Sequence, residues 1–285
     1  MASPSIRITE FTDPGCPWAW NAEPVRARID HVYDGHIEWR VRMVGLSDAR
    51  RTPEEGYDAE GMAERQREIA REYGMPIDTR PRPYAAATMP ACRAVVATKL
   101  HRPEATRRIL RQLRVRNWSG QMLDDPQTLH GAGEDAGIAA GELDVWMAEP
   151  EVEELLSRDV ELARAPLPAA RALDHKLANW SGGRRYTCPS YEIERLQDGV
   201  RIAIPGFQPF AVYDIVLANL VPGLDRRDPP GAAREVLEWS GVPMATQEIA
   251  SVLDEDIYSV HEELARFAHL QPVGADGFWS LSEEA

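Results

Sequence analysis

Cys16, Pro17, Trp18 and Ala19 together form half of a redox motif. We predict a helix that begins just after Cys16, because Pro17 suits the first helical position, where its missing N–H would have been unpaired in any case. A thiol at a helix N-terminus feels the positive end of the helix dipole, and such thiols have lowered pKa values. Thiolates attack disulfides, peroxides and carbon electrophiles. The pattern therefore predicts that Cys16 is a nucleophile.

Ala19 stands where a C-x-x-C motif has its second cysteine, so Cys16 cannot close a disulfide within this motif. Two other cysteines are present. Cys92 follows Met89 and Pro90 on a predicted apolar helix and is expected to fill the core. The seven histidines show no metal-ligand spacing, so we expect no metal site.

Two strands and one helix are predicted to position the motif. Ile6 and Ile8 alternate with polar residues, which indicates a strand, and residues 12–15 form the loop that follows it. The helix after Cys16 is expected to kink at Pro24. Residues 37–43 alternate again and predict a second strand with one buried face. The order is β-α-β.

From about residue 47 to residue 180 the apolar residues recur with helical spacing. The predicted helices cover residues 58–73, 90–100, 103–116, 126–136 and 150–163. Strand character returns at 186–193 and, after a turn near Gly199, at 200–204, which is a β-hairpin signal. A last helix of this part opens after Pro209 and runs through Leu220.

Residues 225–285 form an extension with a predicted helix at 245–253, another at 257–268 and a small hairpin at 273–279. This order resembles the second half of a winged helix. The segment holds thirteen acidic residues against four arginines. Phosphates would be repelled, so packing or docking of a partner is expected here rather than DNA binding.

The motif at residues 13–18, the predicted helical insertion and the later segments 187–190 and 206–209 resemble the DsbA-like branch of the thioredoxin superfamily. The similarity extends over roughly residues 5–222, and is greatest to FrnE-type proteins and the mycothiol-dependent reductase. It implies an α/β thioredoxin-like fold with a large all-helical insertion and a small winged-helix-like extension at the C-terminus. The domain limits that follow are 1–47 and 181–224 for the two thioredoxin-like parts, 48–180 for the insertion and 225–285 for the extension.

The resemblance also implies roles for individual residues. Cys16 matches the nucleophile, and Pro189 matches a cis-proline that would lie beside it and expose backbone groups to a bound thiol substrate. The implied substrate-binding residues are Pro17, Trp18, Ala19, Thr187 and Pro189. Two departures matter: Ala19 replaces the resolving cysteine, and Cys188, directly before the cis-proline, becomes the candidate resolving thiol.

Three functions remain open. The first is a thiol–disulfide oxidoreductase that uses the single thiol of Cys16 on mixed disulfides, which we favour. The second follows from a similarity to kappa-class glutathione transferases and chromene-carboxylate isomerases, which place serine at the position of Cys16. The third is a non-catalytic thioredoxin fold that binds a partner. Substitution of Cys16 by serine separates the first two, because only the first needs the sulfur.

Composition restricts the partners and the compartment. A formal net charge of -14 argues against binding to nucleic acid or anionic membranes. Three cysteines make no disulfide framework. No apolar run is long enough to span a membrane. The first ten residues lack the basic region followed by an apolar region that a signal peptide has. We expect a cytoplasmic protein with no covalently bound cofactor, a low-molecular-weight thiol (mycothiol or glutathione) as cosubstrate, and small-molecule or protein disulfides as substrates.

Overall fold

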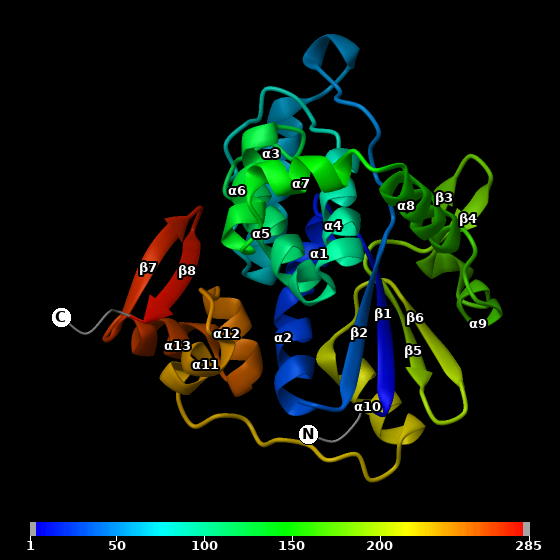
Figure 1. The fold of residues 1–285 in the computed structure, drawn as a ribbon. Helices are drawn as coiled ribbons and strands as arrows, with labels where there is room; N and C mark the ends of the chain where they lie inside the picture. Colours follow the sequence, from blue (N-terminus) through cyan, green and yellow to red (C-terminus); the bar gives the residue numbers. More distant parts are fainter. Residues whose placement is uncertain (1–3, 282–285) are drawn as a thin grey trace.

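The computed structural model describes residues 4–281, and the outermost ends of the predicted terminal domains, at 1–3 and 282–285, lie outside them (Figure 1). At the centre is a four-stranded sheet with the order β2-β1-β5-β6. Its strands are β1 (Ile6–Thr12), β2 (Ile37–Met43), β5 (Ser190–Arg195) and β6 (Arg201–Pro205). β1 and β2 are parallel, whereas β5 is antiparallel to both β1 and β6.

Alternation of apolar residues places one face of this sheet in the core. Ile8 pairs with Ile193 across β1 and β5, and both are fully buried. Against them pack Ile29 of α2 (Glu23–Val32) and Tyr213 of α10 (Phe210–Leu220). The predicted β-α-β and β-β-α halves are therefore confirmed, and together they make a thioredoxin-like core.

The helix after Cys16 is broken into two. α1 (Pro17–Asn21) ends at Ala22, and α2 begins at Glu23 with Pro24 in its first turn. Proline cannot donate the backbone hydrogen bond that would join the two segments. The predicted kink near Pro24 is confirmed, and it leaves α1 as a short helix next to the thiol.

The insertion lies beyond the C-terminal ends of β1 and β2 (Figure 1), and α8 packs against β2. Its α-helices are α3 (Ala59–Tyr73), α4 (Met89–His101), α5 (Thr106–Trp118), α6 (Pro126–Asp135), α7 (Ala140–Met147), α8 (Pro150–Ala163) and α9 (Pro168–Arg171), with 3₁₀ turns η1 (Pro53–Glu55), η2 (Pro103–Ala105) and η3 (Asp174–Lys176). A small ribbon of β3 (Ala178–Trp180) and β4 (Gly183–Arg185) follows. The all-helical description was therefore wrong at the end of the insertion, since β3 falls inside the predicted limit of 180.

The C-terminal extension lies beside α2, against which α12 packs (Figure 1). It contains α11 (Ala233–Ser240), α12 (Thr246–Leu253) and α13 (Ile257–Leu264), followed by a hairpin of β7 (Ala268–Val273) and β8 (Asp276–Leu281). Two predictions are corrected here. Sequence reasoning missed α11, and it extended α13 to residue 268, although the chain already pairs as β7 at that point. Within residues 4–281, no helix is both long and apolar enough to cross a membrane.

A buried charge network ties the core, the insertion and the extension together. Its centre is Arg114 of α5, which bonds to Glu10 of β1 at 2.9 Å and also to Glu23 of α2. Arg26 of α2 bonds to the second oxygen of Glu10 at 2.9 Å. Burial alone would raise the pKa of Glu10, but the charges of Arg114 and Arg26 outweigh it and hold that pKa below its ordinary value.

The network continues along one side of α5 into the extension. Arg107 also bonds to Glu23, and Arg111 bonds to Glu248 of α12 at 2.6 Å. A second nitrogen of Arg111 donates to the carbonyl of Pro243 at 2.8 Å. We refer to these seven residues below as the buried charge network: Glu10, Glu23, Arg26, Arg107, Arg111, Arg114 and Glu248. It makes the extension an integral part of the packed structure.

The tip of the β7–β8 hairpin makes a close contact that can be tested. Gly274 has φ +63°, and a Cβ built on it would lie 2.2 Å from the carbonyl oxygen of Ile77. Gly241 has a similar φ of +62° but open space around it. We expect Gly241→Ala to lower the free energy of unfolding by about 1 kcal/mol, the cost of the left-handed conformation. Gly274→Ala should lower the free energy of unfolding, measured in urea, by clearly more than Gly241→Ala does. Equal losses of stability in the two variants would contradict a close contact at Ile77.

Candidate functional site

Cys16 lies at the junction of β1 and α1, as predicted. It is the N-cap residue of α1 and keeps 3% of its surface exposed. Its backbone N–H donates to the carbonyl of Asp13 at 3.2 Å. Its thiol donates to the carbonyl oxygen of Cys188 at 3.2 Å. The thiol therefore faces the loop that leads into β5, on the far side of the insertion in sequence.

The loop before Cys16 is held by one buried carboxylate. One oxygen of Asp13 accepts the N–H of Gly15 at 2.8 Å. Its other oxygen accepts the N–H of Leu46 and the hydroxyl of Thr88, both at 2.9 Å, and the thiol of Cys92 at 3.5 Å. Burial, followed by the charge of Asp13, raises the pKa of Cys92. Cys92 is thus a buried hydrogen-bond donor in the core, in agreement with its predicted structural role.

Cys188 lies directly beside Cys16, and the Cys188–Pro189 peptide bond is cis. Its thiol is buried and points to the hydroxyl of Thr12 at 3.9 Å. Burial raises the pKa of Cys188, and the hydrogen bond and charge of Cys16 raise it further. All three cysteines, Cys92 included, are free thiols. The structure therefore brings together the predicted nucleophile, the candidate resolving thiol and the predicted cis-proline.

An aromatic cluster lies next to the motif. Trp18, 40% exposed, meets Tyr73 edge to face with ring centroids 5.5 Å apart. Tyr73 meets Phe207 in the same way at 5.6 Å. We call Trp18, Tyr73 and Phe207 the aromatic cluster. Sequence reasoning missed the role of Tyr73, because nothing in the sequence shows that the end of α3 returns to α1.

The other predicted substrate-binding residues divide into two groups. Thr187 is half-buried and Pro189 is buried, both on the loop that faces Cys16, and Pro17 is half-buried at the first position of α1. The side chain of Ala19 is 1% exposed and packs in the core with Phe11 and Cys16. It lies on the inner face of α1, and its contact with substrate stays a prediction, as does that of the buried Pro189.

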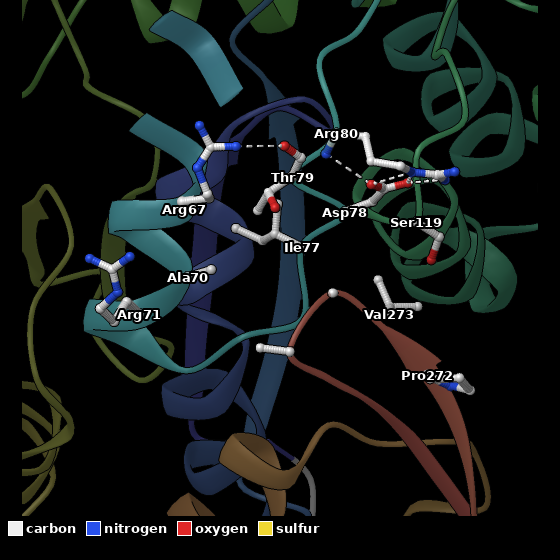
Figure 2. A pocket seen from close by; sticks show the side chains of 12 residues that line it. Arg67, Ala70, Arg71, Ile77, Asp78, Thr79, Arg80, Ser119, Pro272 and Val273 are labelled. Atoms are coloured by element: carbon white, nitrogen blue, oxygen red, sulfur yellow. Dashed lines mark hydrogen bonds and ion pairs between the residues drawn. The ribbon is translucent and has the colours of Figure 1, made fainter. Parts of the chain in front are cut away.

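A cavity of about 660 Å³ lies elsewhere, between α3, the loop after it and the tip of the β7–β8 hairpin (Figure 2). Arginines from α3 and from the loop after it line this cavity, but Arg67 bonds to Glu64 and Arg80 bonds to Asp78. None of the predicted site residues lines this cavity. A neighbouring cavity of about 320 Å³ includes Tyr73 and so reaches the aromatic cluster.

No group of three or more His, Cys, Asp or Glu side chains within residues 4–281 is arranged to hold a metal ion. The chemistry that the arrangement offers is that of a thiol. Cys16 has a carbonyl acceptor, a neighbouring thiol and an exposed aromatic side chain beside it. Attack of sulfur on a disulfide needs no further group than an accessible thiolate and a leaving thiol.

Comparisons with known proteins show which chains this one is similar to. Over 292 aligned positions the chain is 23% identical to the ClpXP adapter protein SpxH of Halalkalibacterium halodurans, covering 98% of this chain and 89% of that protein. A solved structure from Nitrosomonas europaea, of a protein proposed to be a protein disulfide isomerase, has 18% identity and a TM-score of 0.58, covering 75% of this chain and 97% of that one.

The cytosolic disulfide reductase DsbM from Pseudomonas aeruginosa, solved with GSH, has 16% identity and a TM-score of 0.53, covering 75% of this chain and 98% of that one. At such identities these two structures show that the fold is shared. The model of the DSBA-like thioredoxin domain matches residues 7–166, more than half of the chain. With its β-α-β start, its helical insertion and Cys16 at the first strand–helix junction, the chain belongs to the DSBA-like thioredoxin domain family.

Proposed function

We propose that the protein is a thiol–disulfide oxidoreductase that uses Cys16 alone as its nucleophile on mixed disulfides, with a low-molecular-weight thiol such as mycothiol or glutathione as cosubstrate. The observation that carries the proposal is the free thiol of Cys16, which lies at the start of α1 against the Cys188 carbonyl while Ala19 removes the usual partner. The fold shared with a disulfide reductase solved with GSH supports it. A cytoplasmic location, where such thiols are abundant, belongs to the same proposal.

The proposed cycle has two exchanges. The thiolate of Cys16 attacks one sulfur of a disulfide, the sulfur–sulfur bond breaks, and the leaving thiolate takes up a proton. Cys16 is then bonded to the other half of the substrate. An external thiol attacks that half, so that a new disulfide leaves and the Cys16 thiol is restored. Each turnover oxidises one external thiol, and no second cysteine is required.

We expect Trp18 to form one wall of the substrate site, because it is the exposed member of the aromatic cluster next to Cys16. Trp18→Ala should raise the KM for a mixed disulfide about fivefold and change kcat less, since an aromatic contact contributes roughly 1 kcal/mol to binding. Ile215→Ala on α10, which removes an exposed apolar side chain from another helix, is the control. A KM unchanged by Trp18→Ala would place the substrate elsewhere.

Steady-state kinetics test the proposal against the transferase or isomerase alternative. If Cys16 carries a covalent intermediate, the first product leaves before the external thiol reacts, and double-reciprocal plots at several thiol concentrations are parallel. An enzyme of the kappa type holds thiol and electrophile together, so its lines intersect. Intersecting lines, or turnover of an electrophile that contains no disulfide, would favour that alternative.

A non-catalytic binding protein is the second candidate, and one observation favours it. The curated relative that is a ClpXP adapter protein aligns with 98% of this chain. The acidic extension would then be the surface that docks a partner. Absence of any turnover with mixed disulfides, together with unhindered folding, would support this function over an oxidoreductase.

A further inference from the structure

We propose that Cys188 is an internal resolving thiol, which captures the mixed disulfide on Cys16 and closes a Cys16–Cys188 disulfide when external thiol is scarce. This inference rests on the proposed function, because it needs a mixed disulfide on Cys16. Attack by Cys188 gives the mixed disulfide on Cys16 a second route of reaction. The external thiol completes the cycle, whereas Cys188 releases the substrate and leaves the protein in an oxidised, closed form.

The two thiols lie next to each other in the buried core. The Cys16 thiol donates to the carbonyl of Cys188 itself at 3.2 Å, so the two residues are in direct contact. Their side chains also interact with each other, since Cys16 is the hydrogen-bond partner that raises the pKa of Cys188. Both pack in one core cluster with Ala19. Disulfide formation requires neighbouring side chains of this kind, and holding them in place replaces an encounter in solution.

The chemistry balances without any further oxidant. The Cys188 sulfur attacks the Cys16 sulfur of the mixed disulfide, a Cys16–Cys188 bond forms, and the bond between Cys16 and the substrate breaks. The leaving thiolate takes up the proton that Cys188 has lost. The two cysteines are oxidised together while the substrate disulfide is reduced to two thiols. Two molecules of external thiol reopen the Cys16–Cys188 disulfide and restore both cysteines.

Thr12 is the positioning residue for Cys188 in this step. The Cys188 thiol donates to the Thr12 oxygen at 3.9 Å, and Arg114 of the buried charge network donates to the same oxygen. Once Cys188 has lost its proton, the Thr12 hydroxyl hydrogen can turn toward the sulfur and donate to the thiolate. Cys188 is buried and has a raised pKa, so its thiolate needs such a donor. The charged groups that face it are Cys16, whose thiolate opposes ionisation, Asp13, which does the same, and Arg114, which favours it.

The test follows the fate of the mixed disulfide in the full chain. Reduced protein is mixed with oxidised glutathione without free thiol, quenched with N-ethylmaleimide at intervals, and analysed by intact mass and peptide mapping. In the wild type we expect the glutathione adduct to give way to a linkage between the peptides of Cys16 and Cys188. In Cys188→Ser the adduct should persist at least about tenfold longer. Cys92→Ser, which removes another buried thiol, should behave as the wild type.

The outcomes separate this inference from the proposed function. An adduct on Cys16 that persists equally in the wild type and in Cys188→Ser, with no linked peptides, overturns the role of Cys188 and leaves the single-thiol cycle intact. If no adduct forms on Cys16, the proposed function fails and this inference fails with it. Because the linked peptides are sought in the wild type, the test does not depend on the folding of a variant.

Thr12→Val tests the positioning role separately. Valine has nearly the same shape but no hydroxyl, so we expect closure of the Cys16–Cys188 disulfide to slow by about three- to tenfold. The rate of closure should also need a higher pH to reach its plateau, because the Cys188 thiolate has lost a donor. A general loss of packing would slow closure without shifting the pH profile. An unchanged rate and profile would show that Thr12 has no part in the step.

Discussion

The Cys16→Ser variant is expected to lose turnover of mixed disulfides by a factor of about a thousand or more. The serine hydroxyl is not ionised near neutral pH and forms no disulfide, so the first exchange cannot begin. The substitution is nearly isosteric, and the hydrogen bond to the Cys188 carbonyl can be kept by the hydroxyl. The fold should therefore survive, and the loss should appear in kcat rather than in the melting temperature.

Cys92→Ser is the matched control for this result. Cys92 is a fully buried thiol bonded to Asp13, and a hydroxyl can make the same hydrogen bond. We expect its turnover to stay within a small factor of the wild type. Should Cys16→Ser retain much of the activity, the nucleophile assignment would be wrong, and the kappa-type alternative, whose relatives use serine at this position, would take its place.

The second large effect concerns stability. Arg114→Met is expected to lower the free energy of unfolding by about 3–5 kcal/mol, because it leaves the buried carboxylates of Glu10 and Glu23 without their central cation. The side chains of Arg114 and Glu23 are each only 1% exposed. Urea unfolding followed by circular dichroism measures the change. A loss below about 1 kcal/mol would contradict the central place of Arg114.

Arg93→Met provides the comparison. Its partner is Glu153, and that pair lies at the surface with both side chains partly exposed. Exposed ion pairs contribute between 0 and about 1 kcal/mol, so this variant should be almost as stable as the wild type. The two variants remove the same chemical group. Arg114 differs from Arg93 in its burial and in holding two carboxylates instead of one.

The network also sets how stability depends on pH. Burial alone would raise the pKa of Glu23, but the charges of Arg107 and Arg114 outweigh it and hold that pKa well below its ordinary value of 4.5. A carboxyl whose folded pKa is lowered stabilises the protein fully above the unfolded value and loses that contribution as the pH falls toward the folded one. We expect the urea midpoint to decline below about pH 4.5, and less steeply in Glu23→Gln.

Much of the thioredoxin-like core could be predicted from the sequence. The alternation around Ile6 and Ile8 specifies a strand with one buried face, and Pro17 marks the start of a helix. The same alternation puts Glu10 on the buried face of β1, which is a signal that sequence reasoning did not use. Arg107, Arg111 and Arg114 recur with helical spacing, so they share one side of α5. Their common partners could not be predicted, because the contacts join segments about 80 to 140 residues apart.

Only part of the site could be predicted, because several of its contacts also join distant segments of the chain. Cys16 and Pro189 carry motif signals, and their proximity follows once the fold is recognised. The Cys188–Thr12 contact and the aromatic cluster depend on tertiary packing. Tyr73 ends a helix of the insertion, and no periodicity shows that this end lies against Trp18. The local sequence pattern also gave a wrong boundary at β7. The helical spacing of the preceding segment continues to Ala268, where the chain already pairs with β8.

The most direct test of the account identifies the residue that carries the covalent intermediate. The Cys188→Ser protein, in which the internal exit is closed, is treated with excess oxidised glutathione and mapped peptide by peptide. The account predicts a glutathione adduct on the peptide that contains Cys16, its removal by added thiol, and no adduct on Cys92. An unmodified Cys16, or an adduct confined to Cys92, would contradict it.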